Sequence, residues 1–199
     1  MRFVLLQATF VAALGGFLFG FDTAVISGTT EALTKVFQLT DFQLGFTVAS
    51  ALIGTILGSV LVGGPADKYG RRQTLFGVSI LYFVSALGSA WAWNWPIFLF
   101  FRFIGGLGVG GASVVSPMYI AELAPAAYRG RLVAVTQFNI VLGILAAFFS
   151  NYQITKLALG QVEWRWMFGV EALPAALLFI LLFFNPLSPR WLIGQGRLE

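Results

Sequence analysis

The sequence has 199 residues, of which 58% are hydrophobic and only 10% are charged. A soluble domain carries about 25% charged residues, so most of this chain cannot face water, and the composition predicts an integral membrane protein. Cysteine and histidine are absent, which excludes disulfide frameworks and the zinc sites and hydrolase triads built on these residues. The net charge of +4 does not indicate nucleic-acid binding, because the basic residues punctuate apolar stretches instead of clustering on a polar face.

Six apolar stretches are separated by short charged segments. A charge near the bilayer centre is energetically costly, so the gaps between charged residues mark membrane spans, each of which needs about 20 apolar residues. The expected spans are approximately residues 3–28, 42–64, 73–93, 96–119, 132–155 and 166–185. The sequence therefore predicts an all-α membrane protein with a six-helix transmembrane bundle over residues 1–185. Residues 186–199 are expected to form a cytoplasmic segment leading to a missing second half.

The short loops on the two sides of the predicted bundle differ in positive charge. Positively charged side chains are retained on the cytoplasmic side of a membrane, so both termini are expected to be cytoplasmic. The first apolar stretch is interpreted as a span and not as a signal peptide, because it is long, contains Asp22 and has no obvious small-residue cleavage site. The basic residues on the predicted cytoplasmic side are Arg2, Lys68, Arg71, Arg72, Arg129, Arg131, Arg190 and Arg197.

Glycines in the second and fourth spans form two kinds of pattern. Gly106, Gly108 and Gly111 have the GxGxxG spacing of dinucleotide-binding loops. The context argues against that function, because no strand–turn–helix unit surrounds them and they lie inside a membrane-length apolar run. Small residues spaced by four allow helices to approach closely in a membrane, which is the interpretation we favour. The two GxxxG steps are Gly54/Gly58 and Gly106/Gly110.

Three ionisable residues lie inside predicted spans: Asp22, Arg102 and Glu171. Such residues persist in a membrane when they are paired or face a cavity, and they mark transport pathways. Each lies six residues from the outer end of its span, about 9 Å inward at 1.5 Å per residue, so all three are expected at one depth. One arginine would then face two carboxylates.

A cluster of one cation and two carboxylates carries a net negative charge when both acids are ionised, and proton binding neutralises it. If the Asp22–Arg102 pair is made in one conformation and broken in another, protonation shifts the balance between the two. The residues would then couple a proton gradient to movement. The alternative is a structural ion pair between Asp22 and Arg102, with Glu171 at the membrane interface.

A series of glycines, prolines and charged residues recurs along nearly the whole chain in a characteristic order. The series consists of Gly15, Gly16, Phe19, Gly20, Phe21, Asp22 and Gly28, then Gly64, Asp67, Gly70, Arg71 and Arg72, then Arg102, Gly106, Gly108 and Gly110, then Pro117, Met118, Tyr119, Ile120, Ala121, Glu122, Ala124, Pro125, Arg129 and Gly130, then Gln137, Gly143, Trp164 and Arg165, and finally Pro186, Ser188, Pro189, Arg190 and Trp191. Together they resemble the sugar porters of the major facilitator superfamily, most closely the bacterial proton-coupled xylose symporters.

The resemblance implies a membrane transporter and not an enzyme. The family has two six-helix bundles that rock about a sugar, each made of two inverted three-helix repeats, here the amino-terminal bundle. A multi-pass protein of the bacterial inner membrane is implied, with a monosaccharide, the lipid bilayer and a second six-helix bundle as partners and with the proton as coupling ion. No cofactor, metal site or nucleic-acid partner is expected. The acid at position 22 favours proton symport, because facilitative relatives usually carry a neutral amide there.

Matching the family residue by residue also assigns roles on the cavity and on the cytoplasmic side. Phe19, Gln137 and Ile140 would line the sugar, which suits a polyol because an amide offers both a donor and an acceptor to hydroxyl groups. An ordinary buried Gln that bonds two helices is the alternative for Gln137. The residues that resemble the family's cytoplasmic gate network are Asp67, Arg71, Arg72, Glu122 and Arg129.

Three departures from the family pattern matter. Leu187 stands where the closing motif usually has Glu, Phe21 replaces a frequent Tyr, and the chain has six predicted spans where the family has twelve. The amino-terminal half of a proton–sugar symporter is therefore one hypothesis. A half-size transporter that pairs with itself, a facilitative uniporter and a non-transporting membrane scaffold are the others. The buried charges argue against an inert scaffold.

Overall fold

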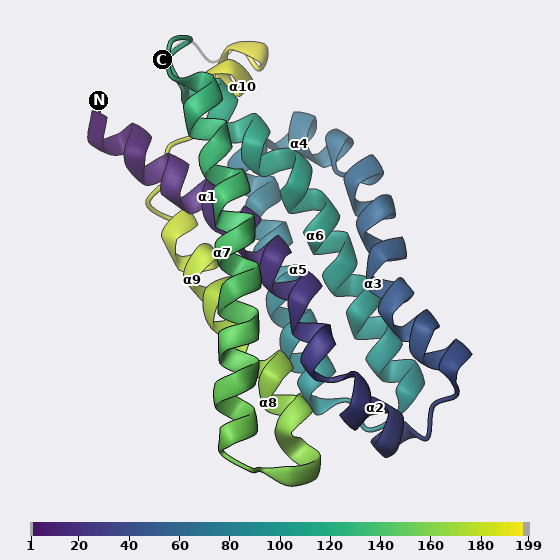
Figure 1. Ribbon diagram of the computed structural model, residues 1–199. Coiled ribbons are helices and arrows are strands. Elements are labelled where there is room, and N and C mark those ends of the chain that lie inside the picture. The colour runs from purple at the N-terminus through teal and green to yellow at the C-terminus, as the bar shows by residue number, and fades with distance from the viewer. Residues whose placement is uncertain (1, 197–199) are drawn as a thin grey trace.

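The computed structural model describes residues 2–196 of the chain, and the regular structure of this part is helical (Figure 1). The helices are α1 (Arg2–Val25), α2 (Thr30–Phe37), α3 (Asp41–Leu61), α4 (Gly63–Tyr69), α5 (Arg71–Trp91), α6 (Trp95–Leu123), α7 (Arg129–Lys156), α8 (Glu163–Val170), α9 (Ala172–Leu182) and α10 (Pro189–Gly194), with short 3₁₀ turns at Ile26–Gly28 and Gly160–Val162. The two ends of the chain lie at the same end of the bundle, beside α4 and α10.

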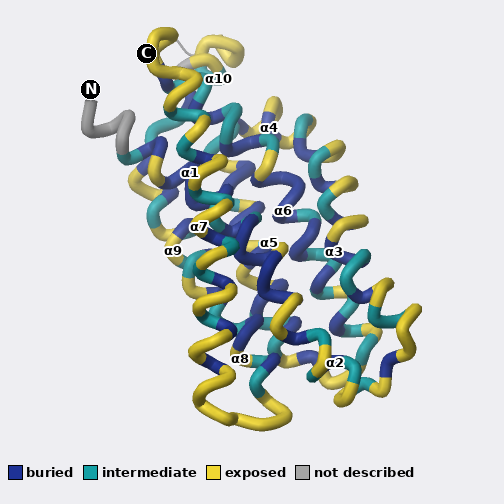
Figure 2. The backbone as a smooth tube through the Cα atoms, in the orientation of Figure 1, coloured by how far each residue is buried: buried dark blue, intermediate teal, exposed yellow. Residues whose placement is uncertain are grey.

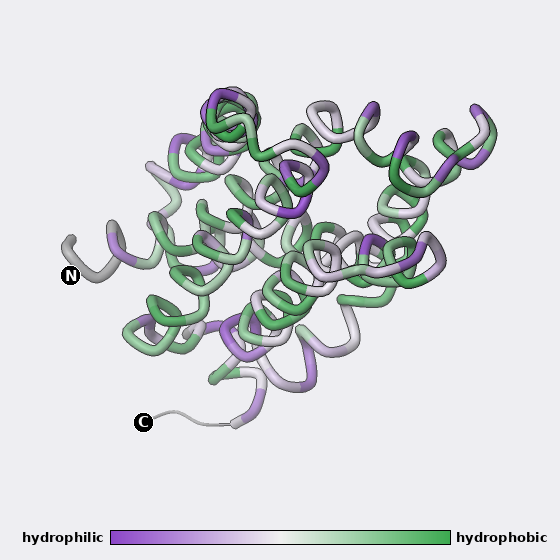
Figure 3. Tube along the Cα trace, turned by 90° about the horizontal axis from the view of Figure 1, so that it is seen from below, coloured by the Kyte–Doolittle hydropathy of each residue, from purple (hydrophilic) through white to green (hydrophobic). Residues whose placement is uncertain are grey.

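Six helical stretches are long and apolar enough to cross a membrane, which confirms the predicted all-α class and the number of spans. Apolar residues dominate along these helices, as the prevailing green of the trace shows (Figure 3). The chain is a multi-pass membrane protein. The stretches are Gln7–Gly28, Asp41–Leu61, Arg71–Trp91, Trp95–Leu123, Arg129–Lys156 and Gly160–Leu182.

Several helix ends follow local signals in the sequence. Helix α3 begins at a capping box, in which the Thr40 hydroxyl accepts from the Gln43 amide and the Gln43 side chain accepts from the Thr40 amide. Helix α6 follows Asn94, whose side chain accepts from the amide of Ile97 at 2.9 Å. Between α4 and α5 the chain turns through Gly70 with φ of +90°, a conformation that favours glycine. These signals fix where three of the spans start.

Glycines bring two pairs of helices into close contact, α3 with α6 and α1 with α7. A Cβ atom on Gly106 would lie 3.0 Å from the Cα of Gly54, and one on Gly143 would lie 2.9 Å from the carbonyl carbon of Phe17. Backbone packs directly on backbone at these points, as small residues allow in membrane helices. The packing interpretation of the glycine steps is confirmed.

The helix pairing has an internal symmetry. The first three spans are α1, α3 and α5, and the last three are α6, α7 and the α8–α9 pair. In this order α1 corresponds to α6, α3 to α7, and α5 to α9. Replacing each helix by its counterpart turns the α1–α7 pair into α6–α3 and the α5–α6 pair into α9–α1. All four pairs are in contact. The α5–α9 pair maps onto itself and is also in contact. This is the pairing expected of two inverted three-helix repeats.

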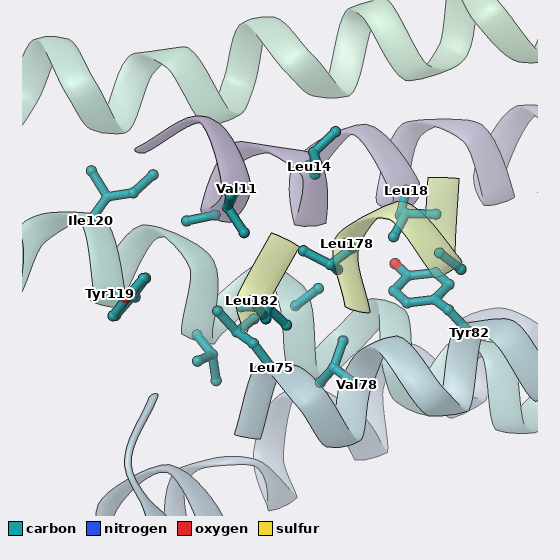
Figure 4. Close-up of a cluster of buried hydrophobic side chains, with 14 of the residues drawn as sticks. Val11, Leu14, Leu18, Leu75, Val78, Tyr82, Tyr119, Ile120, Leu178 and Leu182 are labelled. Carbon is teal, nitrogen blue, oxygen red and sulfur yellow. The ribbon is translucent and has the colours of Figure 1, made fainter. Parts of the chain in front are cut away.

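Two buried apolar clusters fill the bundle. One joins α1, α5, α6 and α9 and includes Leu14, Tyr82, Tyr119 and Leu178 (Figure 4). The other lies toward the opposite end and includes Trp164. The outward surfaces of the helices stay exposed although they are apolar, as Figure 2 shows along α3 and α7. Such a surface suits lipid or another membrane protein and not water.

Candidate functional site

An ion pair joins α1 to α6 inside the bundle. The guanidinium of Arg102 donates through Nη1 to Oδ1 of Asp22, and the two side chains are only 3% and 5% exposed. The guanidinium also lies over the Phe168 ring, 5.3 Å from its centroid. A buried charge needs an opposite charge or a polar contact nearby, because its desolvation costs on the order of several kcal/mol. The ion pair thus links α1 to α6 through two residues that are 80 positions apart in the sequence.

Glu171 stands at a break in the sixth span. The sequence predicted one span over 166–185, and the structure has one span here, Gly160–Leu182. Within it, α8 ends at Val170 and α9 begins at Ala172. Pro174 explains the break, because proline has no N–H to donate and its ring clashes with the carbonyl four residues earlier, that of Val170. The Glu171 carboxyl, 2% exposed, lies at this point beside the carboxyl of Asp22.

The structure therefore brings together the three ionisable residues that the sequence placed at one depth. Two ionised carboxyl groups held close together repel each other, which favours a proton on one of them. The coupling cluster, as we name Asp22, Arg102 and Glu171, can therefore bind and release a proton beside an ion pair that links two helices. Oε1 of Glu171 and Nε of Arg102 have no hydrogen-bond partner within the described part of the chain, so the cluster has unused polar atoms.

A cavity of about 490 Å³ opens between α1, α6 and α7. Phe19, Gln137 and Ile140, the three residues expected to line the sugar, all lie on its wall. Gln137 is exposed, and its side chain forms no hydrogen bond within residues 2–196. This observation contradicts the alternative of a buried Gln that bonds two helices. The amide is free to meet a ligand.

Ser113 and Pro117 also line this cavity, and the sequence analysis assigned them no role in it. Pro117 lies inside α6 and has no N–H, so the carbonyl of Ser113 lacks its usual donor four residues later. An unpaired backbone carbonyl on a cavity wall can accept from a ligand hydroxyl. The signal that could have revealed it was a proline in the middle of a membrane span.

A larger hollow of about 770 Å³ lies between α3 and α5 and is closed at one end by α10. Its wall is mostly apolar, and it contains none of the residues predicted for coupling or for sugar binding. The smaller cavity is therefore the candidate substrate site.

Three of the five residues predicted for the gate network are joined at the end of the bundle that holds both termini. Arg71 donates from Nε to Glu122 at 2.9 Å and pairs through Nη1 with Asp67 at 3.0 Å. The Arg71–Glu122 pair is largely buried, because the two side chains are only 14% and 7% exposed. The Ser188 hydroxyl also donates to Glu122, a partner that the sequence analysis did not identify.

The other two predicted gate residues lie outside this set of ion pairs. Arg72 donates to the carbonyls of Leu182 and Phe183, each at 2.9 Å, and so caps the carboxyl end of α9. Arg129 is exposed at the start of α7 and makes no ion pair within residues 2–196. The network in the structure is therefore smaller than the sequence pattern indicated, and Arg72 holds a helix end instead.

Comparison with known proteins identifies the family. A family model described as "Sugar (and other) transporter" matches residues 8–199. The D-xylose-proton symporter of Escherichia coli K12 is 45% identical over 96% of this chain and 45% of its own length. The glucose transport protein of Synechocystis is 45% identical over 100% and 44%, and the arabinose-proton symporter of Bacillus subtilis is 37% identical over 99% and 43%. The chain thus spans about half the length of these relatives.

Solved structures agree with this match. The proton:xylose symporter XylE bound to 6-bromo-6-deoxy-D-glucose superposes with a TM-score of 0.94 at 44% identity, over 98% of this chain and 48% of the other. A partially occluded inward-open form of XylE from E. coli gives 0.92 at 44% identity, over 97% and 52%. The chain belongs to the sugar porters of the major facilitator superfamily, a family of transporters, and its fold is that of the amino-terminal half of XylE.

Proposed function

We propose that this chain forms the amino-terminal half of a proton-coupled monosaccharide symporter that works by alternating access. The observation that carries the proposal is the coupling cluster, in which a buried ion pair touches a second carboxyl group. Because intramembrane ionisable residues mark ion pathways, this cluster is the proton site. Relatives whose names include proton symport with xylose or arabinose support the assignment.

The cluster couples the proton to movement through the ion pair. A proton taken up by the acidic pair removes one negative charge beside Arg102 and weakens its hold on Asp22. Since these residues belong to α6 and α1, which both line the candidate sugar cavity, the change reaches the substrate site directly. Protonation thus biases the balance between two conformations, which is the requirement for coupling.

The cavity on this half supplies part of a sugar site. The Gln137 amide can both donate to and accept from hydroxyl groups, and the Phe19 and Ile140 side chains cover apolar ring faces. A monosaccharide of the pentose or hexose class fits this chemistry. The remaining contacts come from a second six-helix bundle, which packs against the exposed apolar side of this one.

The orientation follows from the distribution of basic residues. The end of the bundle with both termini holds Lys68, Arg71, Arg72 and Arg129 and faces the cytoplasm, in the inner membrane of a bacterium. The network of Asp67, Arg71 and Glu122 then lies at the cytoplasmic gate. Helix α10 is attached to the same network through Ser188.

The test uses proteoliposomes in which the chain is reconstituted alone or together with the other half of the E. coli D-xylose-proton symporter. Xylose or glucose is added, and alkalinisation of the outside solution is recorded. We expect a signal with both halves present that is lost in Asp22→Asn. Sugar-dependent proton uptake by the chain alone would favour a self-pairing half-size transporter, and uptake that survives Asp22→Asn would contradict the coupling role.

A further inference from the structure

Tyr82 is a buried polar residue that the proposed mechanism does not yet use. It lies on α5, is 1% exposed, and packs its ring on Gly108 of α6, where an added Cβ would lie 3.4 Å from Cδ2 of the ring. Figure 4 shows its hydroxyl oxygen on the side facing Leu18 of α1. That hydroxyl has no hydrogen-bond partner within residues 2–196.

The charged groups around Tyr82 are the three members of the coupling cluster. Along α5, Phe76 packs on Phe179 of α9 and Ala90 accepts from Arg165 of α8, so Glu171 lies alongside the part of α5 that contains Tyr82. Leu18, which the hydroxyl faces, is one turn before Asp22 on α1. Ser85, one turn further along α5, already donates to the carbonyl of Phe101 at 2.7 Å. The Tyr82 hydroxyl is therefore free to serve the cluster. Ser89, another hydroxyl of α5 without a partner among the described residues, lies about two turns further along the helix.

Within the described part of the chain, the Tyr82 hydroxyl is a donor without a partner, and Oε1 of Glu171 is an acceptor without one. Buried polar groups are almost always hydrogen-bonded, so two unpartnered groups beside one charged cluster call for an explanation. Glu171 lies at the junction of α8 and α9, and a phenol hydroxyl can rotate to meet an acceptor.

We propose that Tyr82 is a positioning residue of the coupling cluster, whose hydroxyl donates to the ionised Glu171 carboxylate after the proton has left. The inference rests on the proposed function, because it requires the cluster to bind a proton. In the structure the Glu171 carboxyl lies beside that of Asp22, and the Tyr82 hydroxyl is free. Loss of the proton leaves two carboxylates that repel each other, and the Glu171 carboxylate turns to the Tyr82 hydroxyl.

The expected effect of Tyr82→Phe follows from this exchange of partners. A donor that bonds only the ionised carboxylate favours proton release, so its removal means that the cluster keeps its proton to a higher pH. A hydrogen bond to a charged group corresponds to a shift of the titration midpoint on the order of one pH unit. Phenylalanine keeps the ring and its packing on Gly108.

Infrared difference spectroscopy tests this on the chain in lipid vesicles as the pH is changed. The band of protonated carboxyl groups is assigned by its loss in Glu171→Gln. Tyr119→Phe is the matched control, because Tyr119 is also buried but its hydroxyl donates to the carbonyl of Pro186 and Arg72 is its charged neighbour. We expect the midpoint to move upward in Tyr82→Phe and to stay unchanged in Tyr119→Phe.

The outcomes separate the two proposals. If the band stays in place both in Glu171→Gln and in Asp22→Asn, the cluster is not the titrating site, and both proposals fail. A band that stays in Glu171→Gln but is lost in Asp22→Asn overturns the role of Tyr82 alone. If the band is lost in Glu171→Gln but Tyr82→Phe titrates like the unmodified chain, only the role of Tyr82 is overturned. If Tyr82→Phe does not fold, the phenolic vibrations of the Tyr119→Phe chain are recorded instead, and they test the role of Tyr82. A vibration that shifts with the carboxyl band supports the exchange of partners, and a constant one overturns it.

Discussion

The ion pair between Asp22 and Arg102 closes the contact between α1 and α6 at a depth where water is excluded, and Glu171 touches it from a helix break. By the exchange of the two repeats, α1 and α6 are equivalent helices. The proposed proton site is thus built where the two repeats of the bundle meet. A change in one charge there acts on both repeats together.

The first prediction concerns Asp22→Asn. The amide keeps the size of the side chain and can still accept from Arg102, but it cannot take up or release a proton. In a transporter assembled with a second half, we expect xylose accumulation driven by a pH gradient to be abolished and exchange of labelled xylose to be retained. Asp41→Asn is the control, because Asp41 is an exposed residue in the first turn of α3. Accumulation that survives Asp22→Asn would contradict the proton role.

The second prediction concerns Gln137→Ala. Loss of one hydrogen bond to a sugar hydroxyl lowers affinity by about 2- to 10-fold, corresponding to about 0.5–1.5 kcal/mol. The pH dependence of transport is expected to stay the same, since Gln137 lies on the cavity and outside the coupling cluster. Asn139→Ala is the matched control, because that amide bonds the carbonyl of Val135 on its own helix. Equal affinities in the two variants would remove Gln137 from the substrate site.

The membrane class, the six spans and the meeting of the three buried charges could be predicted from the sequence, because each rests on the high cost of placing charge in lipid. Predicting the Asp22–Arg102 pair required only the position of each residue along its span. The break at Glu171 was missed because the apolar pattern continues through it, although Pro174 was a signal for it.

The gate network was predicted less well, because its partners depend on how the helix ends pack. Arg71 and Arg72 are adjacent in the sequence, yet one reaches Glu122 and the other caps α9. The Ser188 hydroxyl also donates to Glu122, and no periodicity in the sequence reveals such a contact. Local chemistry at loops follows tertiary contacts that a sequence pattern does not contain.

The third prediction concerns Gly106→Ala. A Cβ there would lie 3.0 Å from the Cα of Gly54 and 2.9 Å from the carbonyl carbon of Ala51, so α3 and α6 must separate. Overpacking of this kind costs roughly 1–3 kcal/mol. The control is Gly77→Ala on α5, where nothing lies within 4 Å of the added atom and the gain in helix propensity is the same. Thermal unfolding in detergent is measured by tryptophan fluorescence. We expect the melting temperature to decrease in Gly106→Ala and not in Gly77→Ala. A similar decrease in both variants would show that the glycine contact does not hold the pair.

The last prediction concerns Glu122→Gln. Glu122 receives Arg71 and Ser188 in a partly buried setting, and hydrogen bonds to a charged group contribute about 1.5–3 kcal/mol. The neutral amide weakens both contacts, and α10 loses its attachment to the end of α6. Amide hydrogen exchange measured by mass spectrometry should therefore become faster over residues 188–196.

Glu31→Gln serves as the control for this change, because the Glu31–Lys35 pair has a similar distance of 2.7 Å but lies fully in solvent. Exposed pairs contribute little, so exchange in α10 should not respond to it. If Glu122→Gln leaves exchange over residues 188–196 as slow as before, α10 is held by the Trp191 indole, which donates to the carbonyl of Asp67 at 2.9 Å and lies over Gly70. The gate would then depend on an aromatic contact and not on charge.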